Sequence, residues 1–298
     1  MPGKIVSSLK GRTIRCILFD FGDTLWTRKD AASWHQAERA GNQRATELLK
    51  RIHPVAVPAT PDPLHFGEKL RQTVEAHANS KKSPHYEPDY ALATVEALQQ
   101  LGFPDIERTE AQKIFEALRV RIPESRHLFD DILPTLGELQ RRGFLLGVVT
   151  NRWHGGEPFL EDLEAMGLLD YFDANHMAIS ADLGIRKPNP AIFQHALDAL
   201  RVPAEEAAMV GDSFGADVVG AKQLNIFAVW KPKARLRAEV RKTLSPGTQL
   251  DGELLAAYAY KKEAKKYGLS AEDRHIRPDL IIEHLSELLA VFLKAGVQ

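Results

Sequence analysis

Carboxylate, hydroxyl and ammonium side chains occur at points where short apolar runs of this chain end. Asp20 follows the apolar run at residues 14–19, and Thr150 follows a second run at residues 144–149. A carboxylate in such a place can attack an electrophilic centre and form an acyl-type intermediate. A threonine hydroxyl and a lysine ammonium group, here Thr150 and Lys187, can hold phosphate oxygens. These residue types therefore favour the transfer of an anionic group.

Two further acids, Asp212 and Asp217, follow a third apolar run. Together with Asp20 they offer hard oxygen ligands of the kind that Mg²⁺ prefers. A metal ion and Lys187 would offset the charge that develops in the transition state. Taken singly, each acid is more often a turn or helix-cap residue. Their occurrence together, in this order along the chain, favours a functional role. The four sequence patches that contain them are residues 19–25 (FDFGDTL), 149–151 (VTN), 184–190 (GIRKPNP) and 210–217 (VGDSFGAD).

Short apolar runs alternate with amphipathic segments from residue 130 onward. Strands are expected at residues 144–149, 176–180, 207–210 and 226–230, and helices at 130–142, 158–166, 190–200 and 217–224. This alternation implies βαβ units, so we expect a doubly wound, Rossmann-like α/β fold with a parallel sheet. In such sheets the site lies at the carboxyl ends of the strands, which is where Asp20, Thr150 and Asp212 fall.

The stretch before residue 125 has a different pattern. Helices are expected at residues 32–52, 63–79 and 89–101, with turn-rich stretches at 53–63 and 80–88. We therefore divide the chain into an α/β core, residues 13–26 plus 125–298, and a helical domain inserted at residues 27–124. The first dozen residues are expected to form an irregular lead-in. Residues 278–292 are expected to form a last strand or turn and a closing helix.

The four patches resemble the four motifs of the haloacid dehalogenase superfamily of hydrolases. The Lys-Pro-x-Pro piece at 187–190 and the Gly-Asp-Ser-x-x-x-Asp piece at 211–217 are its most specific parts. By this resemblance, Asp20 is the nucleophile and Lys187 assists it. The helical insert resembles the family's mobile cap, which closes over the site and selects the substrate. The resemblance implies phosphoryl-binding residues Thr150, Asn151 and Lys187, and Mg²⁺ ligands Asp20, Asp212, Asp217 and the Gly22 carbonyl oxygen.

One position departs from the family pattern. Family phosphatases usually carry a second aspartate two positions after the nucleophile, which protonates the leaving oxygen and then activates water. Here that position is Gly22, and Asp23 stands where the family usually has glycine. Neighbouring side chains of an extended chain point to opposite sides, so Asp23 is not expected to take over the role without a local shift. Loss of a general acid–base typically costs about 10²–10⁴-fold in rate.

Three functions fit these residues. The first is a Mg²⁺-dependent phosphatase for a small phosphorylated metabolite, acting through an aspartyl phosphate on Asp20. The second is another reaction of the same nucleophile, such as dehalogenation or phosphonate cleavage. Asp212 and Asp217 argue against dehalogenation, because haloacid dehalogenases of this family lack metal-binding acids. The third is a non-catalytic protein that binds a phosphate ligand or a partner, which Gly22 favours. A phosphorylated receiver domain fits poorly because of the long insert.

The composition narrows the class of protein. The net charge is −1, with 44% hydrophobic and 27% charged residues, so nothing demands nucleic acid or an anionic membrane. The single cysteine, Cys16, suits a reducing compartment, and no apolar stretch is long enough for a signal peptide or a bilayer span. We therefore expect a cytoplasmic protein. Residues 231–274 exceed the family's usual link, and bracing of the cap or a homodimer contact are their candidate roles. Arg28 is a candidate for substrate contact, although a surface arginine is the commoner interpretation.

Overall fold

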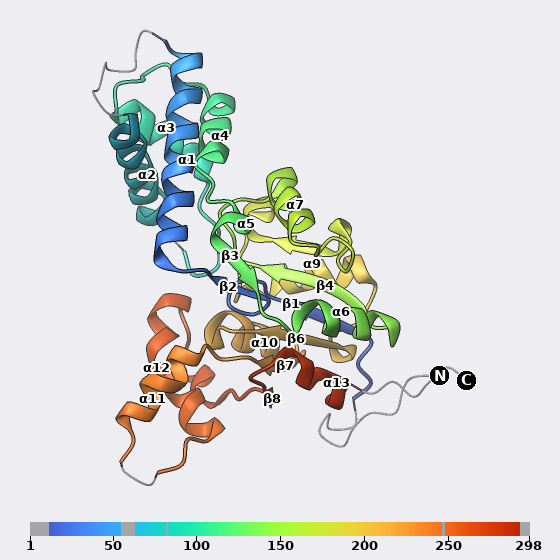
Figure 1. The fold of residues 1–298 in the computed structure, drawn as a ribbon. Helices are drawn as coiled ribbons and strands as arrows, with labels where there is room; N and C mark the ends of the chain where they lie inside the picture. The colour runs from blue at the N-terminus through green and yellow to red at the C-terminus, as the bar shows by residue number, and fades with distance from the viewer. Residues whose placement is uncertain (1–11, 55–62, 82, 246–247, 293–298) are drawn as a thin grey trace.

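The core of the molecule is a six-stranded parallel sheet (Figure 1). Its strands are β1 (Cys16–Phe19), β4 (Leu145–Thr150), β5 (Met177–Ile179), β6 (Ala207–Gly211), β7 (Phe227–Trp230) and β8 (Leu280–Ile281). The structure is a computed structural model that describes residues 12–54, 63–81, 83–245 and 248–292. The strand order is β5-β4-β1-β6-β7-β8, so β1 lies between β4 and β6 in the interior of the sheet.

Helices cover both faces of this sheet, which confirms the predicted doubly wound α/β fold. They are α6 (Ile132–Arg141), α7 (Gly156–Ala165), α8 (Ser180–Leu183), α9 (Pro190–Leu200), α10 (Gly220–Gln223), α11 (Ala234–Thr243), α12 (Gly252–Tyr267) and α13 (Leu288–Val291). The 3-10 helices are η2 (Ala174–His176), η3 (Ala204–Glu206), η5 (Glu272–His275) and η6 (Leu285–Glu287), and η4 (Phe214–Val219) is a short π-helix. Helices α6, α7 and α13 share one hydrophobic cluster, and α9, η4 and α12 share the other.

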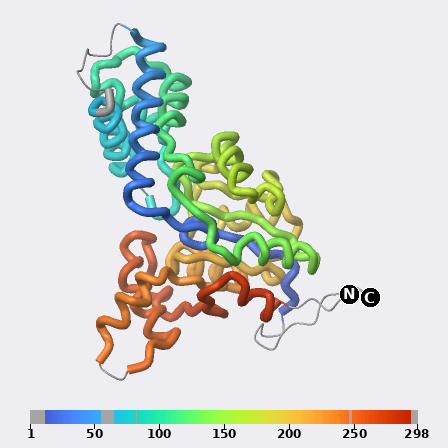
Figure 2. The backbone as a smooth tube through the Cα atoms, in the orientation of Figure 1, coloured from blue at the N-terminus to red at the C-terminus, as the bar shows by residue number. Residues whose placement is uncertain are grey.

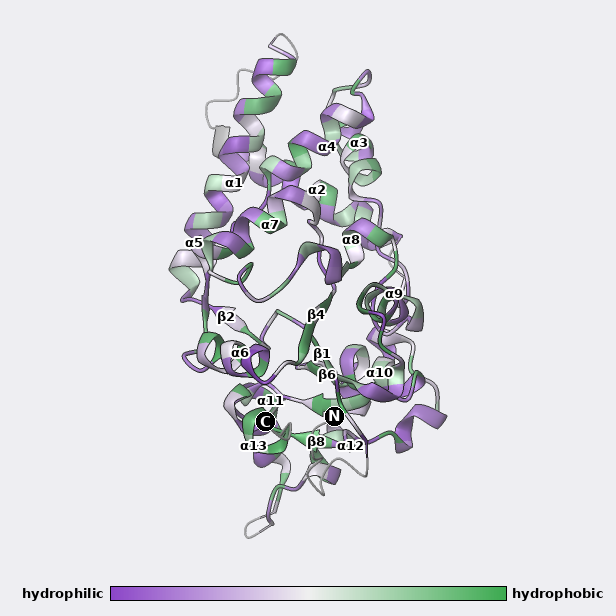
Figure 3. Ribbon diagram, turned by 90° about the vertical axis from the view of Figure 1, so that its right-hand side faces the viewer, coloured by the Kyte–Doolittle hydropathy of each residue, from purple (hydrophilic) through white to green (hydrophobic). Residues whose placement is uncertain are grey.

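The side chains of β1 alternate between these two clusters. Ile17 and Phe19 point into the first cluster, whereas Cys16 and Leu18 point into the second. All four are fully buried, as expected for a parallel strand that is covered on both faces. Figure 3 shows the hydrophobic colour concentrated in the central strands. The apolar run that predicted this strand therefore reflects two buried faces.

A bundle of helices lies apart from the sheet (Figures 1 and 2). It consists of α1 (Ala31–Ile52), α2 (Pro63–Ser80), α3 (Tyr90–Gln100) and α4 (Arg108–Ala117), called the helical insert below, and α5 (Ile122–Ser125) follows it. The first three confirm the helices predicted at 32–52, 63–79 and 89–101. The insert has a hydrophobic cluster of its own, which includes Leu49, Leu70 and Leu98. Its start is fixed by Asp30, whose carboxylate accepts a hydrogen bond from the Ser33 N–H at 2.8 Å.

Two short antiparallel strands connect the helical insert to the core. β2 (Trp26–Arg28) leads out and β3 (Arg126–Leu128) leads back, with Arg28 directly opposite Arg126. These strands were not predicted, because three residues are too few to show an alternating pattern. Nearly all of the predicted lead-in and most of the turn-rich stretch 53–63 lie outside the described residues. Within the described ranges, no helix is long and apolar enough to cross a membrane.

The helical insert contacts the core through stacked rings. The His154 ring, in the loop after β4, stacks on Phe115 of α4 with ring centroids 4.1 Å apart, and Phe115 stacks on Tyr90 at 4.9 Å. Trp153 lies 5.5 Å from Tyr90. The Nδ1 atom of His154 is buried without a hydrogen-bond partner. Burial lowers the pKa of His154 to about 3, so the ring is neutral at pH 7 and packs as an apolar group.

Acidification is expected to weaken this contact. Because the pKa of His154 in the folded chain lies below the ordinary value of 6.5, the unfolded chain binds the proton more readily between pH 6.5 and about 3. The contribution of His154 to stability is complete above pH 6.5 and is lost as the pH falls, by up to about 1.4 kcal/mol per pH unit. Chemical denaturation between pH 7.5 and pH 5 should show a steeper loss for wild type than for His154→Gln.

The matched control for this measurement is His195→Gln, at an exposed position on α9. Its unfolding free energy should follow that of wild type across the pH range. Equal slopes in all three chains would contradict the role assigned to His154.

Candidate active site

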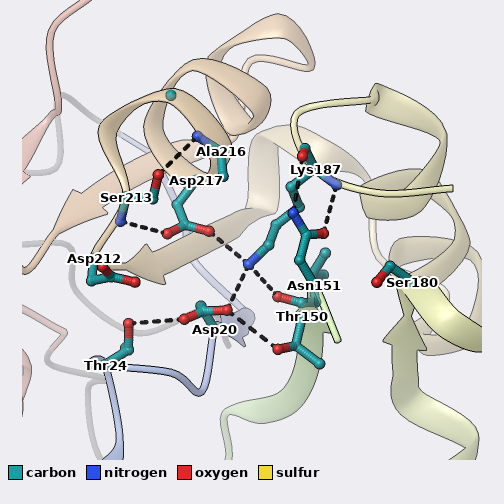
Figure 4. Close-up of polar contacts among 12 residues, drawn as sticks. Asp20, Thr24, Thr150, Asn151, Ser180, Lys187, Asp212, Ser213, Ala216 and Asp217 are labelled. Atoms are coloured by element: carbon teal, nitrogen blue, oxygen red, sulfur yellow. Dashed lines mark hydrogen bonds and ion pairs between the residues drawn. The ribbon is translucent and has the colours of Figure 1, made fainter. Parts of the chain in front are cut away.

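Side chains from four separate parts of the chain meet at the carboxyl edge of the sheet (Figure 4). Asp20 directly follows β1, Thr150 ends β4, and Asp212 directly follows β6. Because β4 and β6 flank β1, their carboxyl ends lie side by side. Lys187, from the loop after α8, and Asp217, from η4, reach the same place. The structure thus brings together the side chains that the sequence singled out.

Three side chains hold the Asp20 carboxylate. Its Oδ1 atom accepts hydrogen bonds from the Lys187 ammonium group at 2.8 Å and from the Thr150 hydroxyl at 3.3 Å. Its Oδ2 atom accepts one from the Thr24 hydroxyl at 3.3 Å. The backbone N–H of Asp20 donates to the carbonyl oxygen of Val210 at 2.9 Å, which fixes the end of β1 against β6. The carboxylate is therefore oriented before any ligand arrives.

Lys187 is the cation at the centre of this arrangement. Its ammonium group lies 2.7 Å from an Asp217 carboxylate oxygen and 2.6 Å from the carbonyl oxygen of Val149, in addition to its contact with Asp20. The side chain is 1% exposed. Burial alone would lower the pKa of Lys187, but the two aspartates outweigh burial and raise it. Lys187 is therefore a fixed positive charge and a counter-ion for two carboxylates.

Asn151 fixes the loop that carries Lys187. The Asn151 Oδ1 atom accepts a hydrogen bond from the Lys187 backbone N–H at 2.8 Å, and its amide group donates to the Lys187 carbonyl oxygen at 3.0 Å. Both ends of the side-chain amide are thus engaged with one residue. This geometry gives Asn151 a positioning role, and its contact with a phosphoryl group stays a prediction.

Three buried carboxylates lie close enough to share a metal ion. Oxygen atoms of Asp20, Asp212 and Asp217 lie within 4.8 Å of one another. Asp217 also accepts a hydrogen bond from the Ser213 N–H at 2.9 Å. A Cβ atom at Gly211 would lie 2.2 Å from the Asp217 carboxyl carbon, so this position requires glycine. Burial raises the pKa of Asp217 to about 6, and burial also raises that of Asp212 well above its ordinary value.

A second lysine, Lys233, neutralises part of this charge. Its ammonium group lies 2.9 Å from Asp212 and 2.5 Å from Asp23. The cluster then holds four carboxylates, those of Asp20, Asp23, Asp212 and Asp217, against two ammonium groups. When all four carboxylates are ionised, the excess is two negative charges, and it lies on hard oxygen donors. The donor set therefore fits a divalent cation such as Mg²⁺.

The turn after β1 contains the departure noted in the sequence. Asp23 has a φ of 59°, a left-handed conformation that aspartate tolerates better than most residues. Its carboxylate accepts a hydrogen bond from the Thr27 hydroxyl at 3.1 Å and pairs with Lys233. Burial opposes this, but Lys233 lowers the pKa of Asp23, so the carboxylate is ionised and engaged. Gly22 is exposed, and a Cβ atom there would meet nothing within 4 Å.

The family model of the haloacid dehalogenase-like hydrolases matches residues 14–225, a range that includes all four patches and more than half of the chain. The chain belongs to the haloacid dehalogenase-like hydrolases. The 2-haloacid dehalogenase of Pseudomonas syringae pv. Tomato DC3000 has a similar structure, with a TM-score of 0.53 and 25% sequence identity. That similarity covers 94% of this chain and 98% of the other.

Curated relatives of this hydrolase include phosphatases. The phosphoserine phosphatase of Thermus thermophilus is 39% identical over 137 residues, which are 45% of this chain and 51% of the relative. The glyceraldehyde 3-phosphate phosphatase of Pyrococcus furiosus is 39% identical over 98 residues, which are 32% of this chain and 38% of the relative. The chain thus spans about half, or less, of these relatives' own length.

Sequence reasoning did not assign a role to several residues of this site. Lys233 follows β7 and so reaches the carboxyl edge of the sheet. Glu263 of α12 accepts hydrogen bonds from the Ser213 hydroxyl and the Gly215 N–H, both at 2.8 Å. Residues 231–274 therefore brace the loop that carries Asp212 in this hydrolase. The position after a strand was the signal for Lys233, whereas no local signal marked Glu263.

Removal of the Lys187 charge is expected to destabilise this hydrolase. Lys187→Met preserves much of the side-chain volume, but leaves Asp20 and Asp217 buried without their counter-ion. Removing one partner of a buried ion pair typically costs about 3–5 kcal/mol. We expect a loss of this size in the free energy of unfolding, measured by chemical denaturation at pH 7.5. Lys262→Met, at an exposed pair with Glu239, should unfold like wild type. If Lys187→Met did so too, the ammonium group would not be what holds the site together.

Proposed function

We propose that this hydrolase is a Mg²⁺-dependent phosphatase that acts on a small phosphorylated metabolite through an aspartyl phosphate on Asp20. The observation that carries the proposal is the Asp20 carboxylate held by Lys187 and Thr150, with two further acids within reach of a shared cation. The names of the relatives in Thermus thermophilus and Pyrococcus furiosus support the same class of reaction.

In this mechanism Asp20 supplies the attacking atom. One carboxylate oxygen forms a bond to phosphorus, and the bond from phosphorus to the substrate oxygen breaks, so that the leaving oxygen keeps the electron pair. Lys187 and Thr150 donate hydrogen bonds toward the same region and offset the charge on the phosphoryl oxygens. Water then attacks the phosphorus of the acyl phosphate, which releases phosphate and regenerates the Asp20 carboxylate.

The proposed Mg²⁺ ligands are the carboxylates of Asp20, Asp212 and Asp217 and the carbonyl oxygen of Gly22. When bound, the ion supplies positive charge against the phosphoryl oxygens. The ligand carboxylates must be ionised, and Lys233 favours this state of Asp212 through its contact at 2.9 Å. Glu263 holds the loop between Asp212 and Asp217 in place through Ser213 and Gly215.

This mechanism lacks a side chain that protonates the leaving oxygen. Gly22 offers no carboxylic acid, and the Asp23 carboxylate is held by Lys233 and Thr27. The leaving oxygen must therefore take its proton from water or from a group of the substrate. Since an oxygen of low basicity needs no proton in order to leave, we expect the enzyme to favour substrates with good leaving groups.

We also propose that residues 27–124 form a cap that selects the substrate. The rings of Tyr90 and Phe115 pack on the loop just after Thr150. The isolated bridge between Tyr86 and Ile185 adds a contact to the loop of Lys187. The insert is thus attached to two of the loops that carry site residues. The location we propose is the cytoplasm, with which the buried, free thiol of Cys16 is compatible.

The first test measures phosphate release from para-nitrophenyl phosphate with Mg²⁺. Wild type should turn this substrate over, because its leaving group needs no general acid. Asp20→Asn should lose at least about 10³-fold in kcat, since the nucleophile is gone. Chelation of divalent ions should abolish turnover, and added Mg²⁺ should restore it. Asp105→Asn, an exposed aspartate of the helical insert, is the matched control and should behave as wild type. Turnover that survives Asp20→Asn would refute the mechanism.

The second test restores the missing acid. Gly22→Asp is sterically free, because a Cβ atom at Gly22 meets no neighbour within 4 Å. A carboxylic acid at this position should raise the rate on an alkyl phosphate such as glycerol 3-phosphate by about 10²-fold, the lower end of what general acids contribute. The gain on para-nitrophenyl phosphate should be much smaller. Gly22→Asn has the same shape without the acid and should gain nothing. Equal rates for Gly22→Asp and Gly22→Asn would show that proton transfer does not limit this enzyme.

A second reaction is favoured by one observation. Displacement of a halide by Asp20 needs no proton on the leaving group, so the absence of an acid at Gly22 costs nothing there. The dehalogenase of Pseudomonas syringae shares the fold with a TM-score of 0.53. The acids Asp212 and Asp217 argue against this reaction, because it needs no metal ion. Halide release from a 2-chloro acid without Mg²⁺, lost in Asp20→Asn, would assign dehalogenation in place of phosphate release.

A further inference from the structure

Two arginines lie directly opposite each other where the chain leaves and re-enters the core. Arg28 of β2 pairs in register with Arg126 of β3. Their guanidinium carbons lie 4.2 and 4.6 Å from the centre of the Trp34 ring, so a side chain of α1 holds both. Like charges directly opposite on a strand pair are destabilising. The fold therefore maintains a repulsive pair at this place.

A third arginine, Arg152, follows Asn151 and is fixed in place. Its backbone N–H donates to the Ser180 hydroxyl at 2.8 Å, and that hydroxyl donates to its carbonyl oxygen at 3.1 Å. Its guanidinium carbon lies 4.3 Å from the ring centre of Phe159 and 5.8 Å from that of Trp26. The Nε atom of Arg152 is buried without a hydrogen-bond partner. This side chain is thus placed by aromatic surfaces and leaves its Nε–H donor unused.

The same rings connect Arg152 to Phe21, the residue after Asp20. Phe21, which directly follows Asp20, stacks on Trp26 with centroids 4.7 Å apart and meets Phe159 edge-on at 5.7 Å. Arg152 therefore packs on the two rings that enclose the neighbour of Asp20. The Asp20 carboxylate raises the pKa of Arg152, although burial is the larger effect and lowers that pKa to about 10. The guanidinium group and the nucleophile are thus within electrostatic range of each other.

The three arginines, called the arginine cluster below, have no acidic partner. Within the described ranges, no ion pair involves Arg28, Arg126 or Arg152. The acid that most affects Arg152 is Asp162, but its carboxylate is paired with Arg119 at 3.2 Å. Burial, together with the nearby Arg28, lowers the pKa of Arg126 to about 10. Arg28 is exposed, but Arg126 and Arg152 are partly buried. Partly buried guanidinium groups without a counter-ion are costly, which points to an anion supplied from outside the chain.

We propose that the arginine cluster binds a second anionic group of the substrate, a carboxylate or a second phosphate, while Asp20 attacks the first. Guanidinium groups present paired donors that match the planar oxygens of a carboxylate and the oxygens of a phosphate. Lys187 and Thr150 already serve the phosphoryl group that is transferred, so the arginines are not needed for it. The inference rests on the proposed phosphatase function and names its substrate class: phosphomonoesters that carry another negative group.

The test compares two matched pairs of probes by isothermal titration calorimetry on the full chain with Mg²⁺. 3-Phosphoglycerate and glycerol 3-phosphate differ in one carboxylate, and fructose 1,6-bisphosphate and fructose 6-phosphate differ in one phosphate. The Asp20→Asn chain is used beside wild type, so that binding is measured without turnover. For at least one pair, the probe with two anionic groups should bind ~10- to 100-fold more tightly than the probe with one, as expected for charged hydrogen bonds. The pair with the larger ratio identifies the anion.

Three substitutions then test which arginines produce this ratio of affinities. Arg152→Gln and Arg126→Gln should each reduce it at least about fivefold, whereas Arg152→Lys, which retains the charge and loses the paired donors, should reduce it less. Arg141→Gln, an exposed arginine of α6 paired with Glu138, is the control and should leave the ratio unchanged. Thermal denaturation of each variant, compared with wild type, identifies any variant that has not folded. If an Arg→Gln variant has not folded, the binding ratio of the Arg→Lys variant at the same position is used to test the proposal.

Two outcomes would overturn the proposal. One is a ratio near 1 in wild type for both pairs of probes. The other is a binding ratio that stays the same in the arginine variants. If both probes of a pair also lost affinity equally, the arginines would act on the transferred phosphoryl group that the two probes share. Failure of the phosphatase proposal is a separate result. In that case the binding ratio is found as expected, but wild type releases no phosphate from para-nitrophenyl phosphate.

Discussion

The buried ammonium group of Lys187 is the interaction on which the rest of the site depends. An ammonium ion loses several kcal/mol of hydration on burial, so it requires close anionic partners. Lys187 finds Asp20 at the end of β1, Asp217 after β6, and the carbonyl oxygen of Val149 on β4. One cation thus connects three adjacent strands at their carboxyl ends. Because these strands form the centre of the sheet, the orientation of the nucleophile is set by the most buried part of the fold.

Charge around Asp20 is separated into two sides. On one side, the four carboxylates of Asp20, Asp23, Asp212 and Asp217 outnumber the ammonium groups of Lys187 and Lys233. Burial raises the pKa of Asp212 and Asp217. On the other side, the arginine cluster has no acid of its own. Each side is unfavourable for the empty chain and is relieved by an added ion of opposite sign. The like charges on each side destabilise the empty fold. Binding of a cation on one side of Asp20 and of an anion on the other would therefore stabilise it.

The sequence contained enough to predict the core and most of the site, for a physical reason. Strands buried on both faces appear as continuous apolar runs, and parallel strands place their carboxyl ends at one edge. Asp20, Thr150 and Asp212 were therefore found from their positions alone. The roles of Glu263 and Arg152 depend on which distant elements pack together. No local sequence pattern distinguishes either residue from its neighbours. The strands β2 and β3 were missed because their three residues each carry too short a pattern, although they place Arg28 against Arg126.

The exchange of residue types at positions 22 and 23 alters one step and leaves the turn intact. The turn needs a residue with positive φ at position 23, and aspartate is among the few non-glycine residues that accept it. Lys233 then binds the Asp23 carboxylate, so the acid contributes to the charge cluster and not to proton transfer. Gly22 retains its carbonyl oxygen, which is the only atom that it contributes to the proposed metal site. In the proposed mechanism, the nucleophile, the cation site and the phosphoryl-binding groups are thus all preserved, and only protonation of the leaving group is lost. A chain of this kind is suited to substrates that leave without help, or that carry an acidic group of their own.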